Sequence, residues 1–314
     1  MNIDKQLLKV LQASAWTKIP YESLLETNPQ QIRIEENNLM KEEGVLEVPD
    51  TIEVFNKEIE RVGKSESLSL RIYKPKVADN LPVVLFFHGG AFIFGSPDQY
   101  DFQMYPLVEE ANVIAVSVDY RLAPEHPYPA ALEDAVLALQ WGSKEAQSIG
   151  GNSDNITLMG SSAGGAIALS LLHLNRDLYH IPIRGAFVMY PPTSDKLNTL
   201  SMKTYANAPM QTYKSARYMW KHYLSRTSDK WTEYAVPNQM IDFWLLPKIT
   251  LILAECDPLI DEAKQYADLV LARGGEVDIW EIKGAVHTFD FFDCELTTNF
   301  TREKIAYFKK LHLM

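Results

Sequence analysis

The stretch that decides the fold of this chain is Gly160-Ser161-Ser162-Ala163-Gly164-Gly165. It follows a short apolar run at residues 156–159 and leads into small and aliphatic residues at 166–174. A strand, a G-x-S-x-G turn and a helix in this order form a sharp, strained turn that lifts the serine clear of the backbone, and glycines permit it. We therefore predict that Ser162 is a candidate nucleophile for attack on an acyl carbonyl.

Working outward from this turn, strand-like and helical patterns alternate. Strand-like stretches occupy residues 52–60, 66–74, 81–87, 113–118, 185–190, 249–254 and 277–282. Helical patterns occupy residues 98–110, 129–147, 163–175, 259–273 and 300–312. Alternation of this kind from residue 80 onward predicts an α/β protein with a largely parallel sheet covered on both faces by helices.

Two segments depart from this alternation. Residues 1–45 contain one amphipathic pattern, at 3–16, followed by a polar stretch, and residues 194–240 are rich in aromatic side chains without a strand-like run. Because open α/β sheets bind ligands at the C-terminal ends of their strands, we expect both segments to cap that edge of a core formed by residues 46–193 and 241–314. The alternative is an ordinary pair of surface helices whose aromatic side chains belong to the core.

The bulk composition is ordinary for a soluble protein, with 46% hydrophobic and 23% charged residues in a chain of 314. A net charge of −11 argues against nucleic acid and anionic membranes as partners. Without a signal-peptide pattern or a long apolar stretch, we expect a cytoplasmic location and no membrane span. Cys256 and Cys294 lack a metal-type spacing, so we expect free thiols, with one disulfide as the alternative.

A serine hydroxyl needs a base to accept its proton and a third group to orient that base. In folds built around this serine turn, the acid and then the histidine follow the serine along the chain. Asp257 follows the strand-like run at 249–254, and His287 follows the run at 277–282 across a short loop. We predict them as acid and base, and we assign Asp261 and Glu262 to the first turn of the next helix, where acidic side chains are favoured.

The segment His88-Gly89-Gly90-Ala91 follows the strand-like run at 81–87. Small residues let backbone N–H groups approach a ligand closely. We expect two N–H donors from Gly89, Gly90 and Ala91, with the N–H of Ala163, to surround a developing oxyanion. His88 is expected to fix this loop by hydrogen bonds.

Taken together, these motifs resemble the hormone-sensitive-lipase-like branch of the α/β-hydrolases, the esterase group with an H-G-G-G motif. The resemblance covers the chain from about residue 50 to its end. Its other matching segments are Asp119-Tyr120-Arg121-Leu122-Ala123-Pro124-Glu125-His126-Pro127, Asp257-Pro258-Leu259 and His287-Thr288-Phe289.

The resemblance implies an eight-stranded mixed sheet, a helical cap, and hydrolysis of short-chain carboxylic esters without a cofactor or metal. It selects Asp257 over Asp261 as the acid, and it suggests a homodimer through a sheet edge. Arg121 and Glu125 are expected to form a structural ion pair or to brace the loop, and Glu133 and Asp134 to lie on the helix surface or fix the loop.

Two residues depart from the family pattern. Ala91 replaces the third glycine of H-G-G-G, and we expect its N–H to remain usable if its φ is negative. Ser161 replaces the acidic residue that usually precedes the nucleophile. Neither change removes Ser162, Asp257 or His287.

Three functions stay open at this point. The first is a carboxylesterase acting on a small-molecule ester through an acyl-enzyme. The second is a small-molecule-binding protein on a hydrolase fold, which the presence of His287 disfavours. The third is an amidase or deacetylase, because the same triad serves amide bonds.

Overall fold

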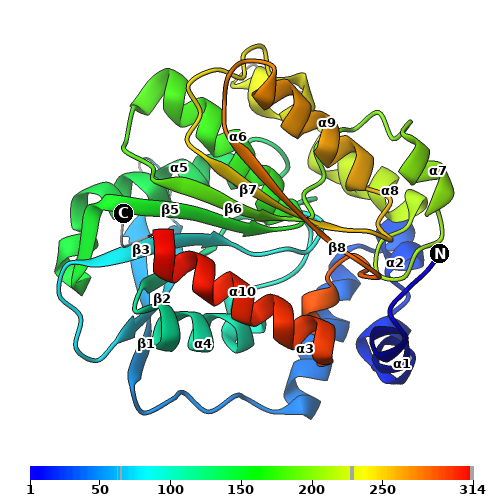
Figure 1. The fold of residues 1–314 in the computed structure, drawn as a ribbon, viewed down its shortest axis with the longest axis horizontal. Coiled ribbons are helices and arrows are strands. Elements are labelled where there is room, and N and C mark those ends of the chain that lie inside the picture. The colour runs from blue at the N-terminus through cyan, green and yellow to red at the C-terminus, as the bar shows by residue number, and fades with distance from the viewer. Residues whose placement is uncertain (62, 64–65, 227–229, 312–314) are drawn as a thin grey trace.

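The computed structural model describes residues 1–61, 63, 66–226 and 230–311, and its centre is one eight-stranded sheet (Figure 1). Residue 312, the last of the helix predicted at 300–312, lies outside the described residues. The strands lie in the order β1-β2-β4-β3-β5-β6-β7-β8. Their bounds are β1 (Ile52–Glu60), β2 (Ser67–Pro75), β3 (Leu81–Phe87), β4 (Ile114–Asp119), β5 (Gly151–Ser161), β6 (Gly185–Met189), β7 (Ile249–Ala254) and β8 (Val277–Ile282).

The sheet is parallel from β4 to β8, and β2 runs antiparallel to both of its neighbours, β1 and β4. All residues of β6 and β7 are buried, which explains their unbroken apolar sequences, whereas the edge strand β1 is mostly exposed. The α/β fold with a mostly parallel eight-stranded sheet is thereby confirmed. Each predicted strand is present within one or two residues of its expected ends, except that the strand expected at 156–159 begins earlier, at Gly151.

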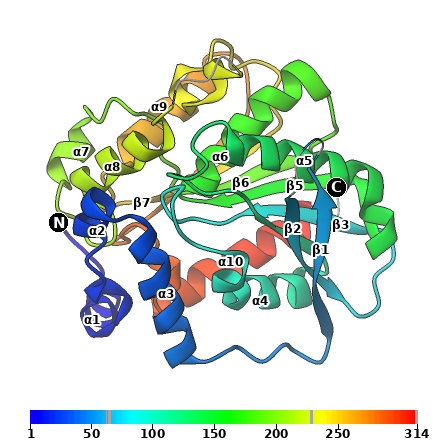
Figure 2. The same ribbon diagram turned by 180° about the vertical axis from the view of Figure 1, so that it is seen from behind.

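Helices cover both faces of the sheet (Figures 1 and 2). Helices α5, α6 and α9 lie on one face and α4 and α10 on the other, so each face has its own apolar core. The bounds are α1 (Lys5–Ala13), α2 (Tyr21–Thr27), α3 (Gln30–Glu43), α4 (Asp101–Ala111), α5 (Ala130–Glu145), α6 (Ala163–Leu174), α7 (Leu200–Thr204), α8 (Tyr213–Tyr223), α9 (Ile260–Leu271) and α10 (Glu295–Leu311).

The sequence patterns missed two helices in the N-terminal segment and part of the last helix. Helices α2 and α3 occupy the stretch that reads as polar, and each buries only one or two side chains, so hydrophobic periodicity is weak there. Helix α2 packs against α8, and the imidazole of His222 lies 2.7 Å from the carbonyl oxygen of Leu25. Helix α10 begins at Glu295, earlier than the expected residue 300.

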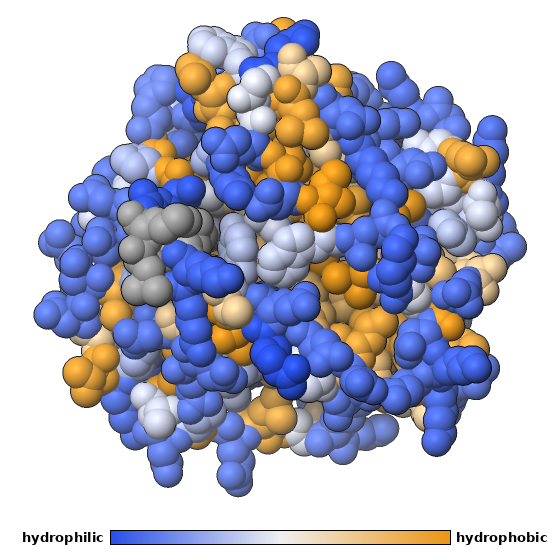
Figure 3. Space-filling view, in the orientation of Figure 1, coloured by the Kyte–Doolittle hydropathy of each residue, from blue (hydrophilic) through white to orange (hydrophobic). Residues whose placement is uncertain are grey.

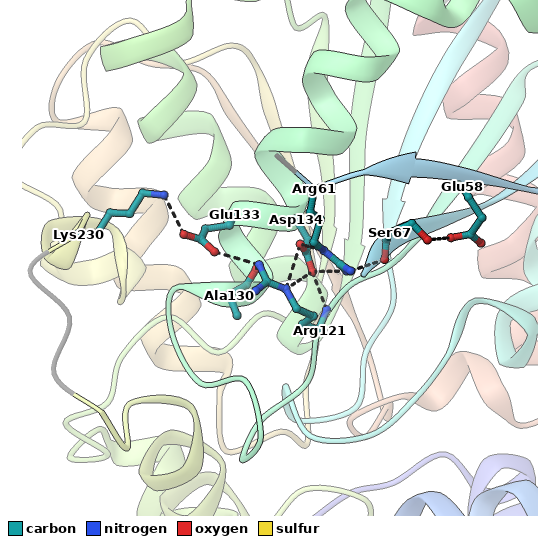
Figure 4. Close-up of polar contacts among 8 residues, drawn as sticks. All are labelled: Glu58, Arg61, Ser67, Arg121, Ala130, Glu133, Asp134 and Lys230. Atoms are coloured by element: carbon teal, nitrogen blue, oxygen red, sulfur yellow. Dashed lines mark hydrogen bonds and ion pairs between the residues drawn. The ribbon is translucent and has the colours of Figure 1, made fainter. Parts of the chain in front are cut away.

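Arg121 forms a buried ion-pair cluster with acids of α5, not with Glu125 (Figure 4). Asp134 is fully buried and accepts hydrogen bonds from the guanidinium groups of both Arg61 and Arg121. Glu125 pairs instead with Arg33 of α3, 2.9 Å away. The expected mutual pair is therefore wrong, whereas each residue does brace the segment after β4, one against α5 and the other against the N-terminal helices.

The surface is predominantly polar on the face shown in Figure 3, where apolar side chains form limited groups among charged ones. Among the described residues, no helix combines the length and the apolar character that crossing a bilayer requires. Cys256 and Cys294 are buried and unpaired, as expected for free thiols.

Candidate active site

Ser162 occupies the strained turn between β5 and α6. Its φ of 52° and ψ of −119° lie in a region that costs a non-glycine residue free energy, and tight packing of the turn holds it there. A Cβ at Gly160 would lie 2.4 Å from the carbonyl oxygen of Gly164, and one at Gly164 would lie 2.1 Å from that of Phe87. The glycines are therefore required for the close approach of the turn to β3.

The structure brings Ser162, His287 and Asp257 into hydrogen-bonding contact. The Oγ of Ser162 lies 2.8 Å from Nε2 of His287, and Nδ1 of His287 lies 2.6 Å from Oδ2 of Asp257. Oδ1 of Asp257 accepts the N–H of Leu259 at 2.9 Å. All three side chains are at most 5% exposed, so the contacts are largely screened from water. This is the geometry in which an imidazole can remove a hydroxyl proton while a carboxylate fixes its orientation.

The loop after β3 presents backbone N–H groups toward the candidate site. The N–H of Gly89 is already engaged, because it donates to the hydroxyl oxygen of Tyr100 at 2.8 Å, which favours Gly90 and Ala91 as the two loop donors among the three predicted candidates. Within the described residues, the N–H groups of Gly90, Ala91 and Ala163 have no protein acceptor. The candidate donors are therefore these three groups, two from the loop and one from the start of α6.

Ala91 departs from the conformation expected for it. Its φ is 54°, and Gly90 and Phe92 on either side also have positive φ, because the loop makes a tight turn in which Ile93 and Phe94 donate to the carbonyl oxygen of Gly90. The condition of a negative φ, under which we expected the N–H of Ala91 to remain usable, is therefore not met, although within the described residues that N–H has no protein acceptor. An alanine in the left-handed region costs roughly 1–2 kcal/mol, and the surrounding packing maintains it.

His88 and Ser161 are fully buried, and Ser161 immediately precedes Ser162. His88 stacks on Tyr120 with ring centroids 4.2 Å apart, its Nδ1 lies 2.7 Å from the carbonyl oxygen of Gly89, and burial lowers its pKa to about 4. It is therefore neutral and fixes the loop, as expected. The hydroxyl of Ser161 donates to Oη of Tyr190 at 2.9 Å.

Ser162 and His287 open onto a cavity of about 110 Å³. Its walls come from the loop after β3, the N-terminal helices, the stretch before and within α8, and the loop after His287. The aromatic side chains of 194–240 do not line it; the wall residues from that segment are Met210, Gln211 and Ser215. Sequence reasoning also missed these wall residues: Trp16, Tyr21, Leu25, Glu36, Phe94, Gln99, Tyr100, Thr288, Phe291 and Phe292.

Glu36 places a buried carboxyl group in the cavity wall. Its oxygens accept hydrogen bonds from Tyr21 and Gln99, each at 3.0 Å, and burial raises its pKa to about 7. The side chain of Glu36 thus joins α2 and α3 to the turn at Pro97–Tyr100. A polar residue in a weakly periodic helix gives no sequence signal for this role.

Glu262 lies in the first turn of α9, as expected, and its side chain is fully buried. Its Oε1 accepts the N–H groups of Thr193 and Ser194 at 2.8 and 3.2 Å. Burial, with a smaller contribution from the nearby charge of Asp257, raises its pKa to about 8. Asp261, in contrast, is partly exposed and accepts the N–H of Ser201 at 2.8 Å.

Glu262→Gln should flatten part of the pH dependence of stability. A carboxyl with a raised folded-state pKa contributes stability below its unfolded pKa of 4.5 and loses it as pH rises through about 8. Glutamine keeps the carbonyl acceptor but cannot ionise. We expect the free energy of unfolding of Glu262→Gln to match that of the wild type near pH 4.5 and to exceed it at pH 9 by about 5 kcal/mol.

Urea unfolding at a series of pH values measures this difference. Asp268→Asn, on the exposed side of α9, controls for removal of a negative charge. A difference in the free energy of unfolding between Glu262→Gln and the wild type that stays constant from pH 5 to pH 9 would contradict the raised pKa of Glu262.

The fold and the geometry around Ser162 define the chain as an α/β-hydrolase, and the comparisons agree. A family model described as the alpha/beta hydrolase fold matches residues 84–291. Esterase LipI of Mycobacterium tuberculosis is 32% identical over 292 residues, covering 91% of this chain and 88% of that protein. Carboxylesterase NlhH of the same organism is 36% identical over 228 residues, covering 71% of each chain. The chain belongs to the hormone-sensitive-lipase-like esterase family of the α/β-hydrolases.

Solved structures show the same fold over the whole chain. A thermostable esterase from Pseudomonas putida superimposes with a TM-score of 0.88 at 24% identity and covers 100% of this chain. An arylesterase superimposes with a TM-score of 0.83 at 27% identity and covers 99% of this chain. At 24% identity, the similarity to the Pseudomonas putida esterase shows the fold alone.

Proposed function

We propose that this protein is a carboxylesterase that cleaves short-chain esters through an acyl-enzyme on Ser162. The observation that carries the proposal is the unbroken contact from Ser162 through His287 to Asp257 beside a cavity. In the first half-reaction, His287 takes the Ser162 proton as Oγ attacks the ester carbonyl, and then gives it to the leaving alcohol. In the second, His287 removes a proton from water as the water oxygen attacks the acyl carbon; the bond between that carbon and Oγ then breaks, His287 returns the proton to Oγ of Ser162, and the acid is released.

The negative charge on the carbonyl oxygen in each tetrahedral intermediate is assigned to the N–H groups of Gly90, Ala91 and Ala163. Donors fixed by the backbone need no reorganisation when the charge develops, and removing one typically costs about 2.7–4 kcal/mol. The turn around Gly90 holds the first two donors, and the N-terminal end of α6 supplies the third.

Residues 1–45 and 194–240 are proposed as the cap over this site. Support comes from α2 and α3 on one side and the α8 region on the other, which contribute wall residues and contact each other. The side chain of Thr212 donates to Glu22 at 2.7 Å, and Lys214 pairs with the same acid. The cavity of about 110 Å³ beneath this cap supports a preference for small acyl groups.

A series of 4-nitrophenyl esters tests the proposal, together with a serine-directed phosphonate and mass spectrometry of the adduct. We expect burst kinetics, the highest kcat/KM for acetate and butyrate, and the phosphonate on Ser162. The same series with 4-nitroanilides separates an ester hydrolase from an amidase. Tight binding of esters without turnover would favour the small-molecule-binding function instead.

Phe291 is proposed as the wall that limits chain length. It lines the active-site cavity and also a second cleft of about 440 Å³, and its ring stands edge-on to Tyr100 and Phe102, each at 5.0 Å. Phe291→Ala should join the two spaces. Because a buried methylene is worth about 0.8 kcal/mol, we expect kcat/KM for octanoate relative to acetate to rise at least about 10-fold.

Phe102→Ala is the matched control for this change in chain-length preference. Phe102 contacts Phe291 and lines only the second cleft, so its removal should leave the octanoate-to-acetate ratio near that of the wild type. An unchanged ratio in Phe291→Ala would show that another wall sets the limit.

The cytoplasmic location and the homodimer through a sheet edge stay predictions. The edges available for such a dimer are β1 and β8.

A further inference from the structure

Lys304 is a buried cation on α10 that the proposed reaction does not use. It is 1% exposed, and within the described residues it has no direct carboxylate partner. Its Nζ donates to Oε1 of Gln103 on α4 at 3.0 Å, and Nε2 of Gln103 donates to Oδ2 of Asp290 at 2.8 Å. Burying an ammonium group without a nearby negative charge costs free energy. The contact from Lys304 through the amide of Gln103 to the carboxylate of Asp290 therefore raises the question of what else this carboxylate does.

The other oxygen of Asp290, Oδ1, is connected by hydrogen bonds to a residue next to the candidate active site. Oη of Tyr190, at the end of β6, donates to Oδ1 of Asp290 at 2.5 Å, and Oγ of Ser161 donates to Oη of Tyr190 at 2.9 Å. Ser161 immediately precedes the proposed nucleophile. Asp290 itself follows the proposed base by three residues and is 3% exposed.

Beyond Ser161 the contacts reach the loop that carries the proposed oxyanion donors. A Cβ at Gly89 would lie 2.6 Å from the hydroxyl oxygen of Tyr100 and 3.5 Å from Oγ of Ser161, so both side chains pack against Gly89. The N–H of Gly89 donates to the hydroxyl oxygen of Tyr100 at 2.8 Å. The hydrogen bonds from Ser161 to Tyr190 and from Tyr190 to Asp290 therefore connect the side chain packed against this loop to the carboxylate.

We propose that Asp290 is a positioning residue that holds the oxyanion loop in place through Tyr190 and through Ser161, which packs against Gly89. These three side chains are named the Asp290 chain. The proposal rests on the proposed function, because it acts on the Gly90 and Ala91 donors through their neighbour Gly89. Aligned hydrogen bonds in a dry interior polarise one another, so an anionic acceptor at the end of the chain stiffens each member. Catalysis by fixed donors depends on that stiffness.

Tyr190→Phe is the mildest test, because it removes one hydroxyl and keeps the ring that lies 4.8 Å from the ring of His287. We expect kcat for 4-nitrophenyl acetate to fall at least about 10-fold with KM changed less than threefold, since a loosened oxyanion loop affects the transition state and not ground-state binding. Tyr266→Phe is the control. Tyr266 is fully buried and bonded to His173, away from the cavity, and its variant should keep the wild-type kcat.

Asp290→Asn tests the role of the carboxylate at the end of the Asp290 chain. An asparagine has one acceptor oxygen, so it cannot accept from Tyr190 and Gln103 together, and it leaves the Lys304 charge uncompensated. That variant should lose stability as well as kcat. Asp290→Asn combined with Lys304→Met removes both charges, and we expect it to recover the wild-type melting temperature within a few degrees while kcat stays at least about 10-fold low.

Adding Tyr190→Phe to that double variant should lower kcat no further, because residues of one chain act as a unit. A kcat within twofold of wild type in Tyr190→Phe, or full additivity of the changes, would overturn the positioning role. Turnover and phosphonate labelling of the wild-type enzyme test the proposed function separately from the role of Asp290. No turnover and no phosphonate on wild-type Ser162 would overturn both, whereas normal turnover with unaffected variants would overturn only the role of Asp290.

Discussion

Ser162→Ala should lower kcat for a short-chain ester by on the order of 10⁵–10⁶-fold, which is the loss seen when the nucleophile of a serine–histidine pair is removed. The hydroxyl that lies 2.8 Å from His287 is the only part of the side chain that changes. Without it the acyl-enzyme cannot form, and only the oxyanion donors and substrate binding remain. We expect their residual acceleration to be about 10³–10⁴-fold over water.

Burst kinetics and phosphonate labelling check this result along with the steady-state rate. Ser162→Ala should show neither a burst nor an adduct, and its melting temperature should stay close to wild type. Ser170→Ala, a buried serine in the middle of α6, is the control and should keep full activity. Wild-type turnover in Ser162→Ala would remove the central residue of the proposed mechanism.

Asp257→Asn should lower kcat about 10⁴-fold by stabilising the wrong tautomer of His287. Oδ1 of Asp257 accepts the N–H of Leu259, and Oδ2 faces Nδ1 of His287. The amide of an asparagine satisfies Leu259 with its oxygen, so its NH₂ group then faces the imidazole. His287 would accept at Nδ1 and carry its proton on Nε2, where it cannot take the Ser162 proton.

The rate at neutral pH and the structure of the variant check this explanation together. Asp261→Asn is the matched control, because Asp261 lies four residues on and accepts only a backbone N–H of α7. It should keep activity within a few-fold of the wild type. Equal losses in the two variants would assign the effect to disturbance of the loop before α9.

The residues of the candidate site could be named from the sequence because they lie at the ends of apolar strands. Parallel strands bring their C-terminal ends to one edge of a sheet, so Ser162, Asp257 and His287 converge as a consequence of the strand pattern. The same pattern located all eight strands. The glycines at 160 and 164 similarly indicate the close approach of backbones around the serine.

Contacts between elements without strong periodicity could not be predicted in this way. The placement of Glu36 in the cavity wall, the burial of Glu262 and the partners of Arg121 depend on which helices pack together. The positive φ of Ala91 likewise follows from the turn around Gly90, against the intrinsic preference of alanine.

What the sequence by itself determined is therefore the order of the strands and of the helices between them, the serine turn and the three candidate reacting side chains. Only the tertiary structure decided that the N–H of Gly89 is occupied by Tyr100, and that Lys304 reaches Asp290 through Gln103. The physical reason is the separation along the chain between the residues that interact. Periodicity and turn chemistry are local properties of the chain, whereas a buried polar group takes whichever partner the packing of distant elements brings within hydrogen-bonding distance.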